Sequence, residues 1–525
     1  MSPPARAMRT CLVLEFFLTA TVFFIFSGTL TPDVNEPNYL AKAKHFWNPD
    51  WCSEDFYLQT GDAHTVFYWV FGWLTLFLPL PTVALVGRLV TCGLLGYSWQ
   101  KLSRSLTSTF GLAIFSAALL LVFNTYFHMA GEWVAGGFEA KGFAYGFVFL
   151  SLAALLGNHW NRAWILLGIA TAFHILIGTW AVVAATIAWC ILGKASDRPS
   201  IRSQIPGFVA GICLSIVGAW PAMALARDTT IAEISQAAEI HVFYRLPHHL
   251  NPDHFFFQQQ SPYLTHFAIR FLIMLLIWVV FAVTQRKNKV LKTLNAFTFG
   301  VLSIATIGIL ISLCTEAHPI LAGRLLRFYW FRLADVMLPA GIALSVMVRA
   351  AALLPERRLF SRSLVAVATL LLLVAPFHDA FLLHRVPAAD RKISPLPEQW
   401  EQWKATCKFA REQTSPDAVF LTPKYSHTFK WYADRSEVAN WKELPQDAPS
   451  VIVWWERIET IHPATPDRKN SLTNRSREEL RSIGRRYKAD YLVTEADPIL
   501  DLPAIYRNDS FAIYSLQDEG AGNDE

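Results

Sequence analysis

The sequence is short of charged residues. Only 17% of its 525 residues are Asp, Glu, Lys or Arg, whereas soluble proteins of ordinary composition reach about 25%. Hydrophobic residues make up 53% of the chain, and the mean hydropathy is +0.30. This balance excludes an ordinary soluble enzyme and indicates a chain that is mostly embedded in a membrane.

Two kinds of motif are also missing. The seven cysteines have no CxxC spacing, so neither a zinc site nor a disulfide framework is indicated. No glycine-rich nucleotide loop occurs, so a soluble nucleotide-sugar donor is not expected. The net charge of +5 is modest, and the basic residues lie mostly between apolar runs, which indicates membrane orientation rather than nucleic-acid binding.

Long apolar runs are what the sequence has in abundance. Runs of about 18 or more apolar residues are typical of membrane-spanning helices. We expect an α-helical polytopic membrane protein with about eleven transmembrane helices. The predicted spans are 12–30, 83–103, 108–124, 141–157, 163–178, 179–193, 204–224, 264–285, 293–314, 328–348 and 363–378.

Basic residues flank alternate ends of these spans. They are Lys101 and Arg104, Arg162, Lys194 with Arg198 and Arg202, "RKNK" at 286–289, and Arg349 with "PERR" and Arg362. Basic loops stay on the cytoplasmic side of a membrane. We therefore expect a multi-pass protein of the cell inner membrane, with a cytoplasmic N-terminus and a periplasmic or other extracytoplasmic C-terminal domain.

One apolar stretch is not counted as a span. "HTVFYWVFGWLTLFLPLP", which ends at Pro81, has no basic flank and is rich in Trp, Tyr and Phe. These residues favour the membrane–water interface. We expect a helix that lies on the outer surface, within an outer loop at 31–82.

The chain changes character after about residue 379. A polar, proline-bearing linker leads into a helix, and the β-rich runs "DAVFLTP", "SVIVWWERI", "DYLVTE" and "FAIYSL" follow. A charged, helix-like run, "SREELRSIGRRYK", precedes "DYLVTE". We therefore predict a transmembrane module at 1–378 and a small α/β extracytoplasmic domain at 379–525.

The first outer loop is rich in acids. In "TPDVNEPNYLAKAKHFWNPDWCSEDF", Glu36 lies three residues before Tyr39. This pattern resembles the first outer loop of the GT-C superfamily of integral-membrane glycosyltransferases, in which an acidic pair follows the first span and precedes an aromatic residue. Here Asn35 stands at the first acidic position, so Asp33 is the second candidate. "FYRLPHHL" and "RFYWFRLADV" also look similar to uncharacterised bacterial multi-pass proteins.

The resemblance implies a fold and a reaction. It implies a GT-C-like membrane module, a soluble outer C-terminal domain, and transfer of a sugar from a polyprenyl-phosphate donor to a glycan, lipid or protein acceptor. Glu36 or Asp33 would be the catalytic base that takes the acceptor's proton. Asp55 and Asp62 are weaker substrate-binding candidates. The alternative is that these acids cap helices in a solvated loop.

The second outer segment, "FHMAGEWVAGGFEAKGFAYGF", holds Glu132, Glu139 and Lys141. Charges at membrane depth are costly unless they are paired or face a cavity. Glu139 and Lys141 are two residues apart, so on one helix they would point to different faces and not pair. They are candidate substrate-binding residues, or interfacial charges open to water.

A third segment, "HVFYRLPHHLNPDHF", crowds histidines with Arg245 and Asp253. His248, His249 and Arg245 are candidates for substrate contact. Imidazoles and a carboxylate can also bind a divalent metal, but the spacing matches no established zinc motif, so we assign no metal site or other cofactor. An ordinary polar loop is the alternative.

The fourth segment is "GRLLRFYWFRLADV". Arg324 and Arg327 are one helical turn apart and share a face, against the expected positive-inside trend, so they are candidates for binding phosphate. Snorkelling of these arginines to the membrane interface is the alternative. Arg332 and Asp335 have the same spacing and could form a pair. His174 is expected to be a hydrogen-bonding core residue rather than a ligand.

Other functions remain open at this stage. The tryptophans of the C-terminal domain can stack on sugars but can equally form its core; they are Trp431, Trp441, Trp454 and Trp455. A transporter or lipid flippase would carry intramembrane charges near the midplane, whereas the charges here cluster at the outer face. A non-catalytic membrane scaffold is the third possibility. No nucleic-acid partner is expected.

Overall fold

The computed structural model of the chain describes residues 3–28, 30–193, 198–257, 262–353, 358–463 and 472–517. Two compact units make up the chain. The helical unit comprises Met1–Gly28, Arg88–Ala224 and Ile234–Leu383, and the mixed unit comprises Thr29–Gly87, Leu225–Glu233 and His384–Glu525. Lys194 and Arg357, two of the predicted basic flanks, lie outside the described residues.

Each of the eleven predicted spans corresponds to one long helix. These are α1 (Pro3–Ser27), α5 (Leu80–Arg104), α6 (Leu112–Tyr126), α7 (Ala140–Leu156), α8 (Trp160–Phe173), α9 (Ile175–Leu192), α10 (Ile201–Ala224), α14 (Pro262–Thr284), α15 (Lys289–Ser312), α17 (Ala334–Leu353) and α18 (Arg358–His378). Within the described residues, seven of them are long and apolar enough to cross a membrane: α1, α5, α9, α10, α15, α17 and α18. The chain is a multi-pass membrane protein, and the count of eleven spans stays a prediction.

Small residues let some of these helices pack closely. A Cβ atom added to Gly211 of α10 would lie 2.5 Å from the Trp164 carbonyl oxygen of α8, and one added to Gly218 would lie 2.1 Å from that of Ala172. Both distances are shorter than the contacts that real Cβ atoms make, so only glycine fits at these two positions. Such stripes of small residues bring helix backbones together where lipid supplies no hydrophobic drive between helices.

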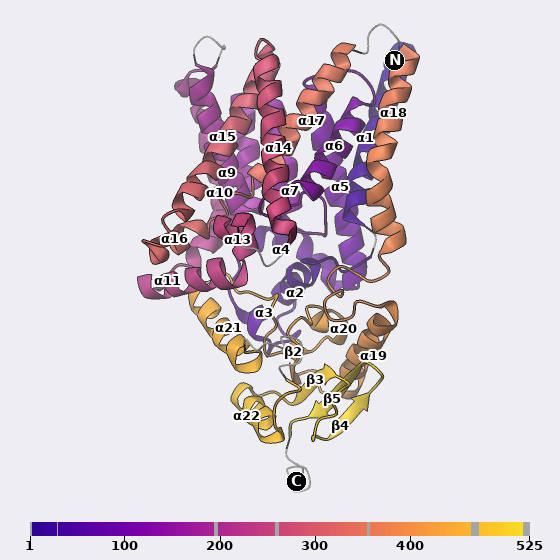
Figure 1. The fold of residues 1–525 in the computed structure, drawn as a ribbon, viewed down its shortest axis with the longest axis vertical. Coiled ribbons are helices and arrows are strands. Elements are labelled where there is room, and N and C mark those ends of the chain that lie inside the picture. The colour runs from indigo at the N-terminus through magenta and orange to yellow at the C-terminus, as the bar shows by residue number, and fades with distance from the viewer. Residues whose placement is uncertain are drawn as a thin grey trace. The chain divides into compact units, whose positions relative to one another are not determined.

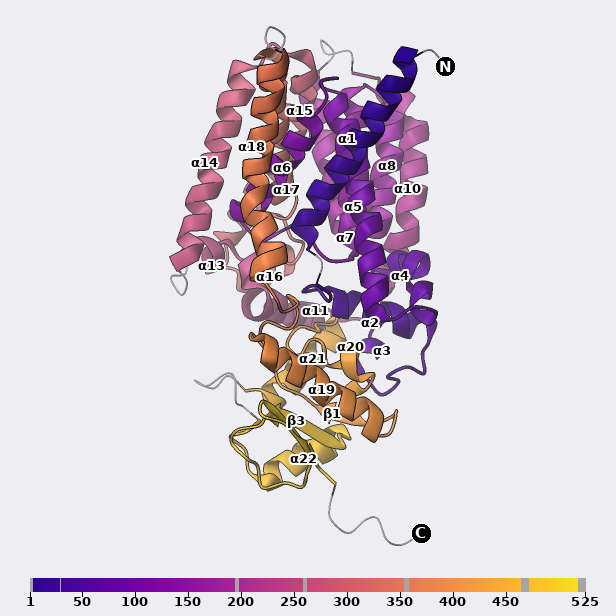
Figure 2. The same cartoon turned by 90° about the vertical axis from the view of Figure 1, so that its right-hand side faces the viewer.

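Short helices gather at one end of the helical unit. They are α11 (Ile231–Glu239), the π-helix η3 (Ile240–Arg245), α12 (Pro247–Leu250), α13 (Pro252–Phe257) and α16 (Pro319–Leu326). Figures 1 and 2 show α11, α13 and α16 at the end of this unit that lies away from the N-terminus. The segments singled out by their charges therefore meet at one end of the bundle.

The stretch that we excluded from the spans is short in the structure. It forms α4 (Thr65–Phe71) and a 3₁₀-helix, η1 (Gly72–Leu76). Together they have 12 residues, whereas a span needs about 20. The structure therefore agrees that this stretch is not a membrane-spanning helix.

The mixed unit contains a five-stranded sheet with the order β2-β1-β3-β5-β4. Strands β1 (Val419–Leu421), β2 (Ser436–Glu437) and β3 (Tyr491–Glu495) are parallel neighbours, and β5 (Phe511–Ser515) runs antiparallel to β3 and to β4 (Ala504–Arg507). Helices α19 (Pro397–Gln413), α20 (Phe429–Ala433), α21 (Ala448–Ile461) and α22 (Arg477–Tyr487) accompany the strands. The α/β character predicted for the C-terminal part of the chain is confirmed.

One predicted strand is wrong. "SVIVWWERI" lies in helix α21, although it is rich in β-branched and aromatic residues. Asp447 caps the helix by accepting a hydrogen bond from the Ser450 amide, and a proline occupies the first turn. Its buried residues, Val451, Trp454, Ile458 and Ile461, follow a helical spacing. That periodicity outweighs the β propensity of the individual residues.

The first outer loop belongs to the mixed unit. Its helices are α2 (Glu36–Trp47), α3 (Phe56–Gln59) and α4. Asp434 of the C-terminal part forms an ion pair with Lys44, at 2.8 Å, and accepts a hydrogen bond from the Trp51 indole. Residues almost 400 positions apart thus share one compact unit, which includes more of the chain than residues 379–525.

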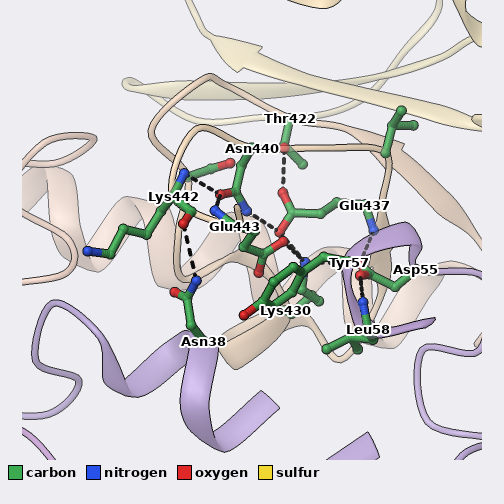
Figure 3. A network of polar contacts seen from close by, with 12 residues as sticks. Asn38, Asp55, Tyr57, Leu58, Thr422, Lys430, Glu437, Asn440, Lys442 and Glu443 are labelled. Carbon is green, nitrogen blue, oxygen red and sulfur yellow. Dashed lines mark hydrogen bonds and ion pairs between the residues drawn. The ribbon is translucent and has the colours of Figure 1, made fainter. Parts of the chain in front are cut away.

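A buried charge network links these two segments (Figure 3). The Lys430 ammonium lies 2.9 Å from Asp55, 2.7 Å from Glu437 and 2.6 Å from Glu443. All four side chains are at most 2% exposed. Thr422 and Asn440 donate further hydrogen bonds to Glu437. One lysine and three carboxylates therefore hold the first outer loop to the C-terminal segment.

One carboxylate of this network, Glu443, has a raised pKa. Burial raises the pKa of Glu443 to about 8, helped by repulsion from Glu437 and Asp55 and opposed by Lys430. Folded Glu443 thus keeps its proton to a higher pH than an ordinary glutamate of pKa 4.5. The folded state binds more protons between about pH 5 and pH 8, so stability is greatest at the acid end of this window and falls as the pH rises through about 8.

We therefore predict that the mixed unit melts at a lower temperature at pH 8.5 than at pH 6.5. The readout is alkylation of the buried Cys407 thiol on heating, followed by peptide mass spectrometry. Glu443→Gln, which mimics the protonated form, should flatten this pH dependence. The exposed Glu456→Gln is the matched control and should retain it. A pH dependence that persists unchanged in Glu443→Gln would contradict this explanation.

Candidate functional site

A single carboxylate organises one end of the helical unit. Asp335, at the start of α17, is fully buried and accepts hydrogen bonds from the backbone amides of Met129, Ala130 and Glu132 at 2.7, 2.9 and 3.1 Å. Asn124 of α6 donates to the carbonyls of Glu132 and Asp335. The loop between α6 and α7 is thus fixed onto the start of α17.

This loop presents the Glu132 side chain to Arg332. The carboxylate lies 3.0 Å from Arg332 Nε and accepts a hydrogen bond from the Tyr145 hydroxyl at 3.2 Å. Arg332 also donates from Nη1 to His174 Nε2 at 3.0 Å. Because Nε2 accepts this bond, it carries no proton and His174 is neutral. The prediction that His174 is a hydrogen-bonding core residue is confirmed.

Arginines surround a histidine and a tyrosine at this end. We call Arg245, Arg327 and Arg332, together with His241 and Tyr329, the arginine cluster. The Arg332 guanidinium lies 3.9 Å from the centre of the Tyr329 ring, and the Tyr329 hydroxyl lies 3.4 Å from His241 Nε2. Burial, together with the charges of the three arginines, lowers the pKa of His241 to about 3. His241 is therefore neutral, and the arginines carry the positive charge.

Backbone geometry at this site is unusual in two places. Tyr329 has φ of +55°, a conformation that is strained for a bulky residue. His241 and Arg245 lie on η3, a single turn of π-helix. Both features occur often at functional sites. The quoted segments "FYRLPHHL" and "RFYWFRLADV", about 80 residues apart, meet here.

The structure corrects two predictions about pairing. Arg332 pairs with Glu132, whereas Asp335 is held by backbone amides, so the predicted Arg332–Asp335 pair is wrong. Glu139 and Lys141 do pair, at 3.6 Å. Glu139 is the N-cap of α7 and has extended backbone angles, so the rule for two residues within one helix does not apply to it. Lys141 also lies 3.4 Å from the centre of the Trp133 ring.

The adjacent histidines have different surroundings. His248 is exposed, and its ring lies 4.1 Å from that of His249. His249 Nδ1 lies 2.5 Å from the Ala130 carbonyl, which can only accept, so Nδ1 carries the proton. Burial and His248 lower the pKa of His249 well below its ordinary value. His249 thus fixes the α6–α7 loop. Across the described ranges, no group of three or more His, Cys, Asp or Glu side chains is arranged to hold a metal ion.

Arg324 lies in the last turn of α16, and Arg327 of the arginine cluster directly follows that helix. Both are half-buried, and the charge of Arg324, after burial, lowers the pKa of Arg327. The two guanidinium groups are therefore near enough to repel each other. Arg245, by contrast, is buried at 8% exposure. An anion that reaches this end would meet Arg324 and Arg327 first.

In the mixed unit, the two candidate bases differ. Glu36 is fully buried at the start of α2, and its Oε2 accepts a hydrogen bond from the Asp33 backbone amide at 2.7 Å. Asp33 is half-buried, and its side chain interacts electrostatically with Arg391. Glu36 therefore fixes the turn that precedes α2, and Asp33 is the more accessible carboxylate.

Asp55 and Asp62 both have structural partners. Asp55 caps α3 through the Leu58 amide and also accepts from the Glu437 amide, in addition to its ion pair with Lys430. Asp62 accepts hydrogen bonds from the His64 amide and the Tyr68 hydroxyl, both at 2.7 Å. These contacts favour a structural role for both residues.

The tryptophans of the mixed unit are largely in its interior. Trp454 is fully buried and Trp431 is 6% exposed. Trp441 and Trp455 are half-buried and lie beside Trp454, with ring centres 5.7 and 6.1 Å from it. Core packing accounts for Trp431 and Trp454.

Sequence reasoning missed the most connected residues of the site. Glu132 was noted but not selected, and Tyr145 and Tyr329 were not considered. Glu132 and Arg332 are 200 positions apart, so spacing rules could not join them. The one available signal was that Glu132 lies in an otherwise apolar stretch, where a charge requires a partner.

Comparison with known proteins gives limited matches. A family model described as a domain of unknown function, DUF6798, matches residues 401–461. No curated protein matches the chain.

Among solved structures, the chain is similar to the oligosaccharyltransferase of Archaeoglobus fulgidus at 12% identity. The apo form gives a TM-score of 0.44 over 93% of this chain and 69% of that chain. The complex with Zn and sulfate gives 0.43 over 92% and 68%. The same enzyme, AglB, with an inhibitory peptide and a dolichol-phosphate gives 0.42 over 93% and 69%.

The Asp335 contacts predict a stability effect. In Asp335→Asn an NH₂ group replaces one carboxylate oxygen and cannot accept a hydrogen bond. At least one buried backbone amide therefore loses its partner, which costs about 1–3 kcal/mol. We expect the helical unit to unfold at a lower temperature, measured as labelling of the buried Cys92 thiol on heating. The exposed Glu316→Gln serves as the control. Equal unfolding temperatures for Asp335→Asn and wild type would refute the organising role of Asp335.

Proposed function

We propose that this protein is a GT-C-like glycosyltransferase. It takes a sugar from a polyprenyl-phosphate donor and transfers it to an acceptor at the outer face of the membrane. The arginine cluster, with Arg324, binds the donor's phosphate. The observation that carries the proposal is the gathering of four arginines at one end of the helical unit.

The charge of this region suits a lipid phosphate. Four guanidinium groups gather in this region, and Arg332 is the one that pairs with Glu132. Arginine presents a planar set of donors that matches phosphate oxygens, and its attraction is stronger where water is scarce. His241 is neutral and can accept or donate a hydrogen bond without adding charge. The donor's leaving group, a polyprenyl phosphate, needs this kind of stabilisation.

The reaction also needs a base. The acceptor hydroxyl oxygen attacks the anomeric carbon, the bond from that carbon to the phosphate oxygen breaks, and a carboxylate takes the hydroxyl proton. We propose that the base is Asp33 or Glu36, on the basis of the resemblance of the first outer loop to that of the superfamily. The greater accessibility of Asp33 and the structural hydrogen bond of the buried Glu36 favour Asp33.

We further propose that the N-terminus is cytoplasmic and that residues 379–525 are extracytoplasmic. The alternate basic flanks support this orientation. Alkaline phosphatase fused after residue 378 should be active, because that enzyme needs an oxidising compartment for its disulfides. The matched fusion after Arg349 should be inactive. The reverse pattern would overturn the orientation and every outer-face assignment.

Donor binding gives the direct test of the phosphate site. Arg327→Ala removes a charge-assisted hydrogen bond worth about 1.5–3 kcal/mol, so binding of a polyprenyl phosphate should weaken about tenfold or more. Arg349→Ala removes an exposed arginine from the predicted cytoplasmic end and should bind as wild type does. Binding would be measured by titration of the purified protein in nanodiscs. Equal affinity of the two variants would argue against a phosphate site at Arg327.

The base is tested separately with isosteric amides. Asp33→Asn cannot accept a proton, so sugar transfer should fall by about two to four orders of magnitude while donor binding is retained. Glu36→Gln keeps an oxygen that accepts from the Asp33 amide, and it is expected to reduce sugar transfer less than Asp33→Asn does. Transfer would be assayed with a radiolabelled polyprenyl-phosphate sugar, with unfolding temperatures checked for both variants. Full activity in both would exclude this loop as the source of the base.

A further inference from the structure

An open groove lies between two of the short helical segments of the helical unit. One wall is Ser235, Glu239 and Phe243, which recur every four residues along α11 and η3. The other wall is Pro319, Ile320 and Gly323 of α16. The groove has a volume of about 110 Å³, which is smaller than the pockets that enclose whole ligands. Both ribbon views show α11 and α16 side by side (Figures 1 and 2).

The groove is mainly apolar and open. Ile320 is 64% exposed, and Glu239 lies at the surface as the single charged residue of the lining. Gly323 packs closely against Phe243, because a Cβ atom there would lie 3.2 Å from Phe243 Cε2. Apolar surface continues along the same elements at Leu321, which is also exposed. One narrow, apolar chain would fit such a groove.

The groove and the arginines are built from the same segments. Gly323 directly precedes Arg324, and α16 ends at Arg327. On the facing wall, Phe243 lies between His241 and Arg245 on η3. An apolar channel therefore runs beside a group of positive charges. This combination is complementary to an amphiphile that has an anionic head and a single chain.

We propose that this groove holds the start of the donor's isoprenoid chain while Arg324 and Arg327 hold its phosphate. The proposal rests on the proposed function and adds the place of the chain. A polyprenyl phosphate carries one chain, whereas a glycerophospholipid carries two, and the size of the groove favours one. The groove would then make affinity depend on chain length, separately from the phosphate contacts.

The test compares two ligands that share a phosphate. One is a long-chain polyprenyl phosphate, and the other is a five-carbon isoprenyl phosphate. Gly323→Leu fills the groove, and Ile320→Gln makes its exposed wall polar without altering the core. Gly93→Leu is the matched control, since a Cβ atom at Gly93 has no neighbour within 4 Å. Affinities would be measured with the full chain in nanodiscs.

In wild type, the long-chain phosphate should bind more tightly than the short one. Gly323→Leu should weaken binding of the long chain about tenfold, or about 1.4 kcal/mol, and leave that of the short chain within about twofold. Ile320→Gln should also weaken binding of the long chain, and Gly93→Leu should bind both phosphates as wild type does. If both groove variants bind the long-chain phosphate as tightly as wild type does, the inference about the groove is wrong, while the proposed function stands. The same holds if phosphatidylglycerol competes for the groove as well as the long-chain polyprenyl phosphate does. Failure of wild type to bind either phosphate would overturn the proposed function as well.

Discussion

The polar centre of the helical unit depends on the burial of one carboxylate. Asp335 is enclosed by an apolar bundle, where an ionised group is costly unless it is fully hydrogen-bonded. Three backbone amides of the α6–α7 loop meet this requirement. The loop is fixed by the same contacts, so Glu132 is held against Arg332, and Arg332 in turn against His174 and Tyr329. Asp335 therefore positions the α6–α7 loop, and through it Glu132 and Arg332.

The acid-rich first outer loop has a largely structural explanation. Asp55 joins the Lys430 network, Asp62 holds an amide and a tyrosine, and Glu36 closes the start of α2. These contacts make the loop part of the mixed unit. Of the two candidate bases, Asp33 is more accessible than the buried Glu36, which is why the proposed chemistry centres on it.

Sequence reasoning succeeded where the signal is local. Apolar length located all eleven long helices, and alternating strand and helix patterns predicted the α/β character of the mixed unit. It failed where the answer depends on neighbours that are distant in the sequence. The β-branched and aromatic residues of α21 are typical of a strand, although its buried positions follow a helical period. Glu139 and Lys141 pair because Glu139 precedes its helix, and Glu132 meets Arg332 only through the fold.

The central claim is that the arginine cluster and Arg324 receive a lipid phosphate. The most direct measurement is an experimental structure of the full chain in a lipid bilayer with a bound polyprenyl phosphate. The account predicts phosphate density within hydrogen-bonding distance of Arg324 or Arg327, with the chain leaving between α11 and α16. A phosphate ordered at another part of the protein, with none at these arginines under saturating ligand, would contradict it.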